Sequence, residues 1–202
     1  MKLFGHPLST ATRKVLMTLE ETKTSYEFVV IDFMKGEHKQ EPHLSRQPFG
    51  QLPALDDDGF GLYESRAMIR YIDAKAGHPL SSTDLQTAAV MEQFMSVEVC
   101  NFNSNAMKFI YHHVFQRPQT PEMLEAAGVM VDKVYAVLDK QLTTNTFLTG
   151  DKLSLADIVY APYIEYMAGT PAKDLLANHK HAAAWWNRVS ERPSWQKAAG
   201  RA

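Results

Sequence analysis

The segment Gln51-Leu52-Pro53-Ala54-Leu55 constrains the fold of this chain most, because it places a proline at the entrance of a short apolar run. Proline removes a ladder donor, so the run is poor material for a central strand. Such a run suits the start of a strand whose backbone N–H and C=O groups remain free to pair with a ligand backbone. Glu64-Ser65 then head a helical pattern and add a carboxylate acceptor and free helix N–H groups. Together the two segments favour a receptor for a small zwitterionic peptide.

Short strands and helices alternate through the first third of the chain. Ser9 or Thr10 can cap a helix with one apolar face, and the Asp58-Gly59 step is a strong hairpin signal. The expected strands cover 2–5, 26–30, 53–55 and 61–63, and the expected helices cover about 10–22 and 65–75. This βαβ-ββα order predicts a parallel strand pair joined to an antiparallel hairpin. The stretch 33–50 is polar and irregular.

A stretch rich in Gly, Pro, Ser and Thr separates this part from a second half without strand patterns. We therefore expect an α+β domain over 1–76, a linker over 77–85 and an all-helical domain over 86–202. Helical patterns cover 85–114, with room for a bend, and 121–142, 154–167, 172–176 and 181–192. Ser154 and Asp157 form a capping motif at one helix start, so Asp157 is interpreted as a buried structural residue rather than a catalytic one.

Composition excludes several classes of function. Apolar residues make up 45% of the chain, enough for a core, and the net charge of −2 gives no reason to expect nucleic-acid binding. A single cysteine, Cys100, excludes an internal disulfide, fits a reducing compartment and is expected to be a small buried hydrophobe. The N-terminus has no apolar signal core, and the apolar runs fall short of the roughly 20 residues that cross a bilayer. These observations predict a soluble cytoplasmic protein without a membrane partner.

The sequence motifs that could indicate a metal site, a phosphate loop or thiol–disulfide exchange are incomplete. His112-His113 cannot aim both rings at one metal from a helix, because neighbours on a helix lie about 100° apart, and the other histidines lack cysteine partners. We therefore expect no metal site. Gly59-Phe60-Gly61 lacks the Gly-Lys-Ser/Thr of a phosphate loop. The absence of Cys-x-x-Cys leaves thiol–disulfide exchange of the thioredoxin kind without its residues.

The chain resembles the cytosolic glutathione transferases over essentially its whole length. The resemblance is carried by the stretches 4–13, 35–39 and 46–54 together with Glu64-Ser65-Arg66, and the first two stretches look most like the phi class. It implies a thioredoxin-like amino-terminal domain followed by an all-α domain. It also implies glutathione as co-substrate with no prosthetic group, a small electrophile as second substrate, a role in detoxification, and a symmetric homodimer.

Ser9 is the catalytic candidate. The residues alone favour a helix cap, whereas the resemblance places Ser9 at the phi-class catalytic position, with Thr10 and Thr12 as the nearest competitors. A free thiol has a pKa of roughly 8.5, and lowering it by about two units needs about 2.7 kcal/mol of preferential thiolate stabilisation. A hydroxyl donor and the positive end of a helix could supply that energy, so that glutathione's sulfur is the nucleophile.

The resemblance also assigns the glutathione contacts. It implies a cis bond between Leu52 and Pro53, which frees the Leu52 backbone to pair with the ligand as an added strand would. Glu64 would accept from the α-ammonium, and Ser65 would hold the γ-glutamyl carboxylate at a helix N-terminus. Gln51 would bind the same end, and the glycyl carboxylate would pair with His38 and Lys39. Arg13 and Arg66 are interpreted as structural.

The wall of the second-substrate pocket is expected to be apolar and to decide specificity. Its candidates are Leu8, Phe33, Met107, Tyr111 and Phe115, although aromatic and Met residues at helical spacing usually belong to a core. Phe49 precedes a glycine in an irregular segment; packing beneath its own loop is one interpretation, and the resemblance implies insertion into a partner subunit.

The predicted function is a glutathione transferase that conjugates the thiolate of glutathione to small apolar electrophiles. A glutathione-dependent peroxidase that uses the same thiolate is one alternative. Two others are a non-catalytic carrier of glutathione and apolar ligands, and an assembly subunit that keeps the peptide site without using it.

Overall fold

The computed structural model describes residues 1–201, which divide into two compact units. Unit 1 contains Met1–Pro79 and the residues from Pro193 onward, and unit 2 contains Leu80–Arg192. The division after Pro79 falls inside the linker expected over 77–85. The C-terminal segment belongs to unit 1, whereas from the sequence we expected it in the helical domain over 86–202. The reason is packing against the first helix, described below.

Unit 1 is built on a four-stranded mixed sheet with the order β2-β1-β3-β4. β1 pairs in parallel with β2 and antiparallel with β3, and β3 forms a hairpin with β4, which confirms the predicted βαβ-ββα order. The strands are β1 (Lys2–Gly5), β2 (Glu27–Val30), β3 (Ala54–Asp57) and β4 (Phe60–Tyr63). The helices are α1 (Thr10–Glu21), α2 (His43–Arg46), α3 (Ser65–Lys75) and α11 (Pro193–Ala198), with a 3-10 turn η1 (Glu37–Lys39).

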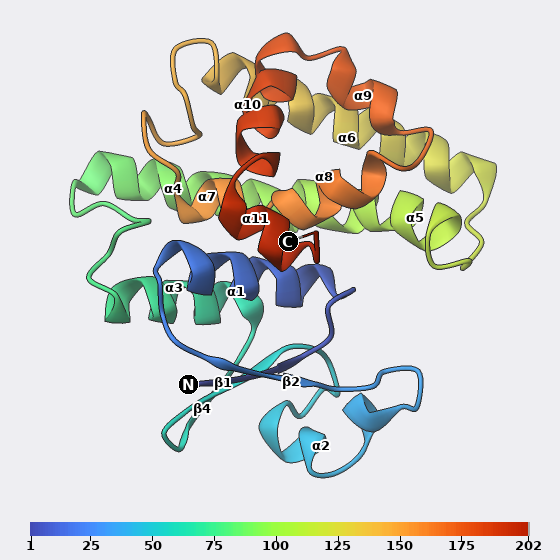
Figure 1. Ribbon diagram of the computed structural model, residues 1–202. Coiled ribbons are helices and arrows are strands. Elements are labelled where there is room, and N and C mark those ends of the chain that lie inside the picture. Colours follow the sequence, from blue (N-terminus) through green and yellow to red (C-terminus); the bar gives the residue numbers. More distant parts are fainter. Residues whose placement is uncertain (202) are drawn as a thin grey trace. The chain divides into compact units, whose positions relative to one another are not determined.

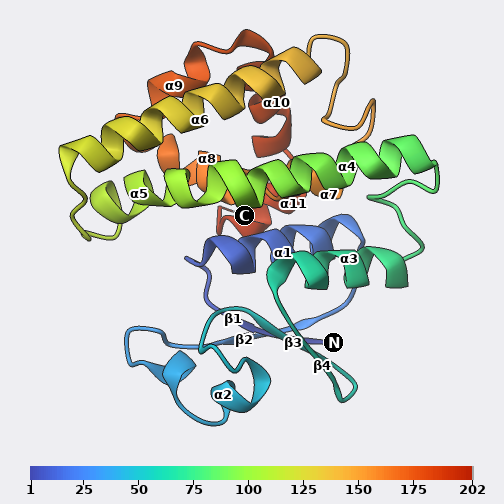
Figure 2. The same cartoon turned by 180° about the vertical axis from the view of Figure 1, so that it is seen from behind.

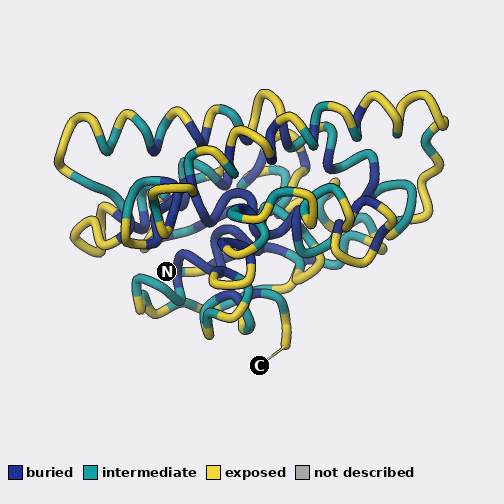
Figure 3. The backbone as a smooth tube through the Cα atoms, turned by 90° about the horizontal axis from the view of Figure 1, so that it is seen from above, coloured by how far each residue is buried: buried dark blue, intermediate teal, exposed yellow. Residues whose placement is uncertain are grey.

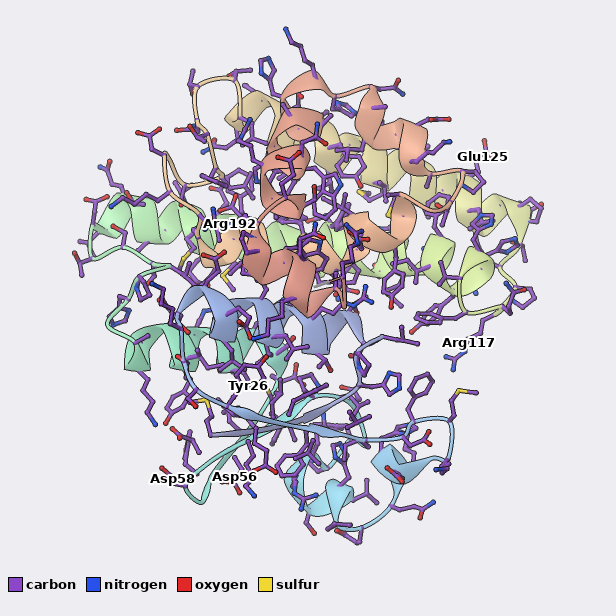
Figure 4. All side chains as sticks on the ribbon, viewed as in Figure 1. Tyr26, Asp56, Asp58, Arg117, Glu125 and Arg192 are labelled. Atoms are coloured by element: carbon purple, nitrogen blue, oxygen red, sulfur yellow. The ribbon has the colours of Figure 1, made fainter. Side chains whose placement is uncertain are left out.

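Helices α1 and α3 pack side by side on one face of this sheet, and α2 lies on the other side (Figure 1). Arg46 of α2 places its guanidinium carbon 4.1 Å from the centre of the Phe4 ring on β1. Asp58 lies in the hairpin turn (Figure 4), and Asp56 of β3 accepts a hydrogen bond from the Gly59 N–H of that turn at 2.9 Å. The polar stretch 33–50 was expected to be irregular, but it contains η1 and α2.

Helix α11 packs along α1, which explains why the C-terminal segment belongs to unit 1. Trp195 is fully buried, the Lys197 ammonium lies 2.8 Å from the Glu20 carboxylate, and the Ser194 hydroxyl donates to Glu21. No sequence pattern predicted this helix, since the recognised pattern ended at residue 192.

Unit 2 is helical, as predicted. Its elements are α4 (Leu85–Val97), a π-helical turn η2 (Glu98–Phe102), α5 (Asn103–His113), α6 (Pro121–Gln141), α7 (Leu155–Ile158), α8 (Ala161–Met167), α9 (Lys173–Ala177) and α10 (Lys180–Ser190). The helix expected over 85–114 is the run from α4 through η2 to α5, with the π turn in its middle (Figure 2). Cys100 lies in that turn and is exposed, so the expectation of a buried cysteine was wrong. The extra residue of a π turn rotates the following positions around the helix, which helical periodicity does not anticipate.

Asp157 is fully buried and accepts four hydrogen bonds at the start of α7. Its Oδ2 accepts from the Ser154 N–H at 2.8 Å and from the Ser154 hydroxyl at 2.7 Å. Its Oδ1 accepts from the Leu148 N–H at 2.9 Å and from Trp185 Nε1 at 2.8 Å. The structural interpretation of Asp157 is therefore supported, and the carboxylate ties the start of α7 to the preceding loop and to α10.

The longer helices bury one face and expose the other, as the alternating colours along the backbone in Figure 3 show. Within residues 1–201, none of the helices combines the length and the hydropathy of a membrane span.

Candidate active site

The sheet register of unit 1 brings the amino-terminal candidate segments to one end of the sheet. Gly5 at the end of β1 is opposite Val30 at the end of β2, and Phe4 is opposite Ala54 at the start of β3. Ala54 is in turn opposite Tyr63 at the end of β4. The chain therefore leaves β1, β2 and β4, and enters β3, at the same sheet end. Segments that are far apart in the sequence, 6–9, 31–53 and 64–65, are neighbours there.

Ser9 is the N-cap of α1, and its Oγ accepts a hydrogen bond from the Thr12 N–H at 3.2 Å. The side chain is half-buried. No acceptor for the Ser9 hydroxyl proton occurs among residues 1–201, so the capping bond leaves a donor available. The positive end of α1 lies at the same position.

Two hydrogen bonds hold the loop between β1 and α1. Arg13 Nε donates to the Pro7 carbonyl at 2.8 Å, and the His6 Nδ1 atom accepts from the Leu8 N–H at 3.2 Å. Burial lowers the pKa of His6, which keeps the ring neutral and its Nδ1 able to accept. Thr12 is fully buried with its Oγ1 3.4 Å from the His6 N–H, which is a poor position for meeting a ligand.

The bond between Leu52 and Pro53 is cis, as the family resemblance implies. Pairing of β3 begins at Ala54, and the Leu52 N–H and C=O make no hydrogen bond within the described part of the chain. Gln51 is exposed, with its backbone held in place on both sides. Its N–H donates to Gln47 Oε1 at 3.1 Å.

Two residues that fix this loop were not predicted from the sequence. His43 is buried, and its Nε2–H donates to the Gln51 carbonyl at 2.7 Å. Gln47 is also buried, and its Oε1 accepts from the Phe49 N–H at 2.7 Å as well as from Gln51. Both lie in the polar stretch 33–50, where the pattern gave no period. The one sequence feature that could have indicated these roles was a polar residue next to the Pro48-Phe49-Gly50 turn.

Glu64 and Ser65 form the start of α3. Glu64 is exposed and has φ of +71° and ψ of +108°, a sparsely populated conformation for a residue with a side chain. The first helical bond runs from the Met68 N–H to the Glu64 carbonyl, and no side chain caps this helix. The Ser65 N–H therefore lies at a helix end that no side chain caps.

His38 and Lys39 belong to η1, which packs against α2. Burial lowers the pKa of His38, and the neighbouring Lys39 and His43 lower it further, so the ring is neutral. The Nδ1 atom of His38 is buried without a hydrogen-bond partner. Lys39 Nζ donates to the Phe49 carbonyl at 2.9 Å. Among the described residues, no group of three or more His, Cys, Asp or Glu is arranged to hold a metal.

The expected second-substrate residues lie in both units. In unit 1, Leu8 is 44% exposed and the half-buried Phe33 ring lies 4.6 Å from that of His6, edge to face. In unit 2, Met107, Tyr111 and Phe115 follow one another at helical spacing and are half-buried. Their meeting in one pocket stays a prediction.

The residues at and just beyond the end of α5 have further aromatic neighbours. The Phe115 ring lies 6.4 Å from that of Tyr111 and 5.6 Å from that of Tyr166. Arg117 lies beyond the end of α5 (Figure 4), with its guanidinium 5.5 Å from the Tyr111 ring centre. The cluster therefore combines an apolar face with one cation at its end.

Phe49 is 64% exposed, with its ring centre 6.2 Å from that of Tyr63. Its backbone is fixed on both sides, by Gln47 at the N–H and by Lys39 at the carbonyl. The interpretation of Phe49 as packed beneath its own loop is wrong, because most of the ring faces solvent.

Comparison with known proteins agrees with this geometry. The family model for the glutathione S-transferase N-terminal domain matches residues 1–74, and that for the C-terminal domain matches residues 102–193. A probable glutathione S-transferase F1 from Oryza sativa subsp. japonica is 35% identical, with 98% of this chain and 95% of that protein covered.

Solved structures show the same fold. Glutathione transferase F7 from Populus trichocarpa superposes with a TM-score of 0.92 at 34% identity, covering 99% of this chain and 98% of the other. Glutathione S-transferase I from mais, in complex with an atrazine glutathione conjugate, gives a TM-score of 0.90 at 33% identity, with 99% and 96% covered. The chain therefore belongs to the glutathione S-transferase family of enzymes and is most similar to its phi class.

Proposed function

We propose that this protein ionises the thiol of glutathione beside Ser9 and directs the thiolate onto small apolar electrophiles. The proposal is carried by the Ser9 hydroxyl, which caps α1 through its oxygen and keeps its proton for a further acceptor. A sulfur placed there receives that hydrogen bond at the positive end of α1. Thr12 is a weaker candidate because its side chain is fully buried.

The rest of the sheet end suits the tripeptide. The unpaired N–H and C=O of Leu52 offer an edge for the cysteinyl backbone. The uncapped N-terminus of α3, with Ser65, suits the γ-glutamyl carboxylate, and the exposed Glu64 carboxylate suits the α-ammonium. Gln51 contributes an amide at the same end. Lys39 and the neutral His38 supply a cation and a ring N–H for the glycyl carboxylate.

The reaction follows from this placement. The thiol loses its proton to solvent, and the thiolate attacks the electrophilic carbon. A C–S bond forms while the bond to the leaving group breaks, and with an aryl halide the halide leaves with the electron pair. Leu8, Phe33 and the cluster of Met107, Tyr111 and Phe115 are proposed to hold the apolar electrophile. The peroxidase alternative would start from the same thiolate.

Replacing Ser9 by Ala tests the catalytic role. A hydrogen bond to a charged group contributes about 1.5–3 kcal/mol, so the pKa of bound glutathione should rise by about 1–2 units in Ser9→Ala. Ultraviolet titration of the thiolate measures that pKa directly, and turnover of chlorodinitrobenzene should fall while glutathione affinity holds. Thr10→Ala removes a neighbouring hydroxyl and is the matched control. Equal thiolate pKa values in Ser9→Ala and the parent would refute the role of Ser9.

The same proposal includes a homodimer with Phe49 at its contact. An aromatic ring that is 64% exposed on a loop fixed at both peptide groups is suited to insertion into a partner. Sedimentation should show dimers that dissociate more readily in Phe49→Ala than in Phe60→Ala, which removes another exposed ring. Unchanged dissociation in Phe49→Ala would remove Phe49 from the contact.

A further inference from the structure

The aromatic surface at the end of α5 has a cation beside it that the proposed function does not use. The guanidinium carbon of Arg117 lies 5.5 Å from the centre of the Tyr111 ring, and the rings of Phe115 and Tyr111 are 6.4 Å apart. The side chains proposed to hold the electrophile are all uncharged. Arg117 therefore provides the one formal charge whose position beside that surface the structure defines.

The turn after α5 holds Arg117 in this position. The Arg117 N–H donates to the Tyr111 carbonyl at 2.8 Å, and the side-chain amide of Gln119 donates to the Arg117 carbonyl at 3.2 Å. The Gln119 N–H donates to His112 Nδ1 at 3.0 Å. These bonds tie the turn to the last turn of the helix. The backbone of Arg117 is therefore fixed next to Tyr111 before any ligand arrives.

No acidic group of the protein neutralises this cation. Within residues 1–201 the Arg117 guanidinium makes neither a hydrogen bond nor an ion pair, and its side chain is exposed. The sequence from 99 to 121 contains no Asp or Glu. Glu125 of the neighbouring helix α6 lies well apart from Arg117 (Figure 4). The positive charge is therefore available to an anion that approaches the aromatic surface.

The chemistry of a guanidinium on an aromatic ring defines what it can bind. Contact with the ring uses the face of the planar group and leaves its N–H donors, which lie in the plane, free for a carboxylate. Two parallel N–H donors match the two oxygens of a carboxylate. A neutral aromatic molecule gains only the ring contacts with Tyr111 and Phe115. An aromatic molecule with an anionic substituent gains these contacts and the charge pair.

We propose that Arg117 makes this protein select aromatic electrophiles that carry a carboxylate or another anionic group. The ring of the electrophile packs against Tyr111 and Phe115, and the anion pairs with the guanidinium. The inference rests on the proposed function, which assigns these two aromatic residues to the electrophile. Arg117 takes no part in making or breaking bonds, and the anionic group stays on the product.

Chlorodinitrobenzoate and chlorodinitrobenzamide form a matched pair of probes when the carboxylate or amide lies para to the chlorine. Both lose chloride to the glutathione thiolate, and they differ in one charge. The kcat/KM of each is divided by the rate constant of its uncatalysed reaction with glutathione, which corrects for their different reactivity. The parent should favour the benzoate by up to about fivefold, the range of an exposed charge pair. About 1 M salt should reduce this preference.

Three variants assign the preference to one residue. Arg117→Gln removes the charge and should bring the two normalised kcat/KM values together. Arg117→Lys keeps the charge without the planar fork and should retain part of the preference. Lys140→Gln is the matched control, because it removes the same net charge at the opposite end of α6 and should leave the preference unchanged.

Four results would overturn the inference. They are equal normalised values for the two probes in the parent, an undiminished preference in Arg117→Gln, an equal loss of preference in Lys140→Gln, and a loss in Arg117→Gln that appears only as a higher KM for glutathione. The last result would assign Arg117 to a carboxylate of glutathione instead. The salt dependence is measured on the parent and requires no variant to fold.

The outcomes also separate this inference from the proposed function. If the protein turns over neither probe nor chlorodinitrobenzene, the proposed function and the inference fall together. If it turns over both probes without preference, the inference alone is wrong. The thiolate pKa in Ser9→Ala is measured without any electrophile, so it tests the proposed function whatever the role of Arg117.

Discussion

Replacing Asp157 by Asn should destabilise unit 2 through one specific loss. Each carboxylate oxygen accepts two hydrogen bonds, and all four donors belong to the protein. The amide of Asn keeps one accepting oxygen and turns the other position into a donor. If the amide nitrogen replaces Oδ1, it leaves both the Leu148 N–H and Trp185 Nε1 without an acceptor. If it replaces Oδ2, the Ser154 hydroxyl can rotate to accept, and only the Ser154 N–H is left unpaired. The second arrangement is therefore preferred.

One buried unpaired N–H costs about 1–3 kcal/mol, so Asp157→Asn should lower the free energy of unfolding by that amount. Asp157→Ala removes the acceptor of all four donors, of which the three N–H groups cannot rotate to another partner, so it should cost at least about 3 kcal/mol. Asp139→Asn is the matched control, because Asp139 accepts from the His181 and Ala182 N–H groups at 2.6 and 2.9 Å but is only half-buried, where water can replace a lost bond.

Urea unfolding, followed by circular dichroism at fixed protein concentration, measures all three variants, with the midpoint and slope reported separately. The expected order of stability is parent, Asp139→Asn, Asp157→Asn, Asp157→Ala. If Asp157→Asn is as stable as Asp139→Asn, the four-donor network does not contribute as its geometry requires.

Three further predictions concern unit 1. The Lys75 ammonium and the Tyr71 hydroxyl donate to the Asp57 carboxylate and lower the pKa of Asp57, with the Lys75 bond as the larger cause. The stability that this carboxylate contributes is therefore present above the unfolded pKa of about 3.9 and is lost as the pH falls through the lower folded pKa. The stability gap between parent and Asp57→Asn should accordingly close in acid titrations of the urea midpoint, and a gap that persists at the acid end would contradict the linkage. Gly50 has φ of +57°, and a Cβ there would lie 2.7 Å from Lys39 Cδ and 2.8 Å from the His38 carbonyl oxygen. Gly50→Ala should therefore raise the KM for glutathione more than Gly59→Ala does, because a Cβ at Gly59 would have no atom within 4 Å. Equal KM values in the two variants would show that the position of Lys39 does not matter for glutathione binding. Trp195→Ala should cost about 3–5 kcal/mol of unfolding free energy because Trp195 is fully buried. Lys197→Ala should cost less than about 1 kcal/mol because the Lys197 side chain of the ion pair with Glu20 is 58% exposed. Similar urea midpoints for the two variants would mean that α11 does not stabilise unit 1.

The elements predicted well from sequence are those whose ends carry local chemistry. Ser9 caps α1, Asp58-Gly59 turns the hairpin, and Ser154 with Asp157 begins α7, each through contacts within three residues or a two-residue turn. Such contacts are visible in any short window of sequence. The sheet order followed from them because two of the three strand pairings join strands that are neighbours along the chain.

The features that escaped prediction depend on distant contacts. Helix α2 is four residues long, too short to be favoured by its own hydrogen bonds, and Arg46 anchors it on Phe4 of β1. Helix α11 is ordered on α1 through Trp195 and through partners at Glu20 and Glu21. His43 and Gln47 matter because the loop folds back over them, which periodicity does not encode. Residues of this kind are recognised from the folded loop, not from the spacing of their side chains.

From the sequence, helix capping and catalysis were alternative roles for Ser9, and the geometry of its side chain is compatible with both. A hydroxyl carries one donor and two acceptor lone pairs. The Thr12 N–H uses one lone pair of Oγ at 3.2 Å, which fixes the side-chain rotamer at the helix end and leaves the proton unused. The capping bond therefore orients the donor that the proposed chemistry requires. A cap residue that only accepts, as Asp would at this position, should preserve α1 yet fail to stabilise a thiolate. Ser9→Asp should accordingly match the parent in urea midpoint while raising the pKa of bound glutathione above that in Ser9→Ala, because a carboxylate repels the sulfur anion.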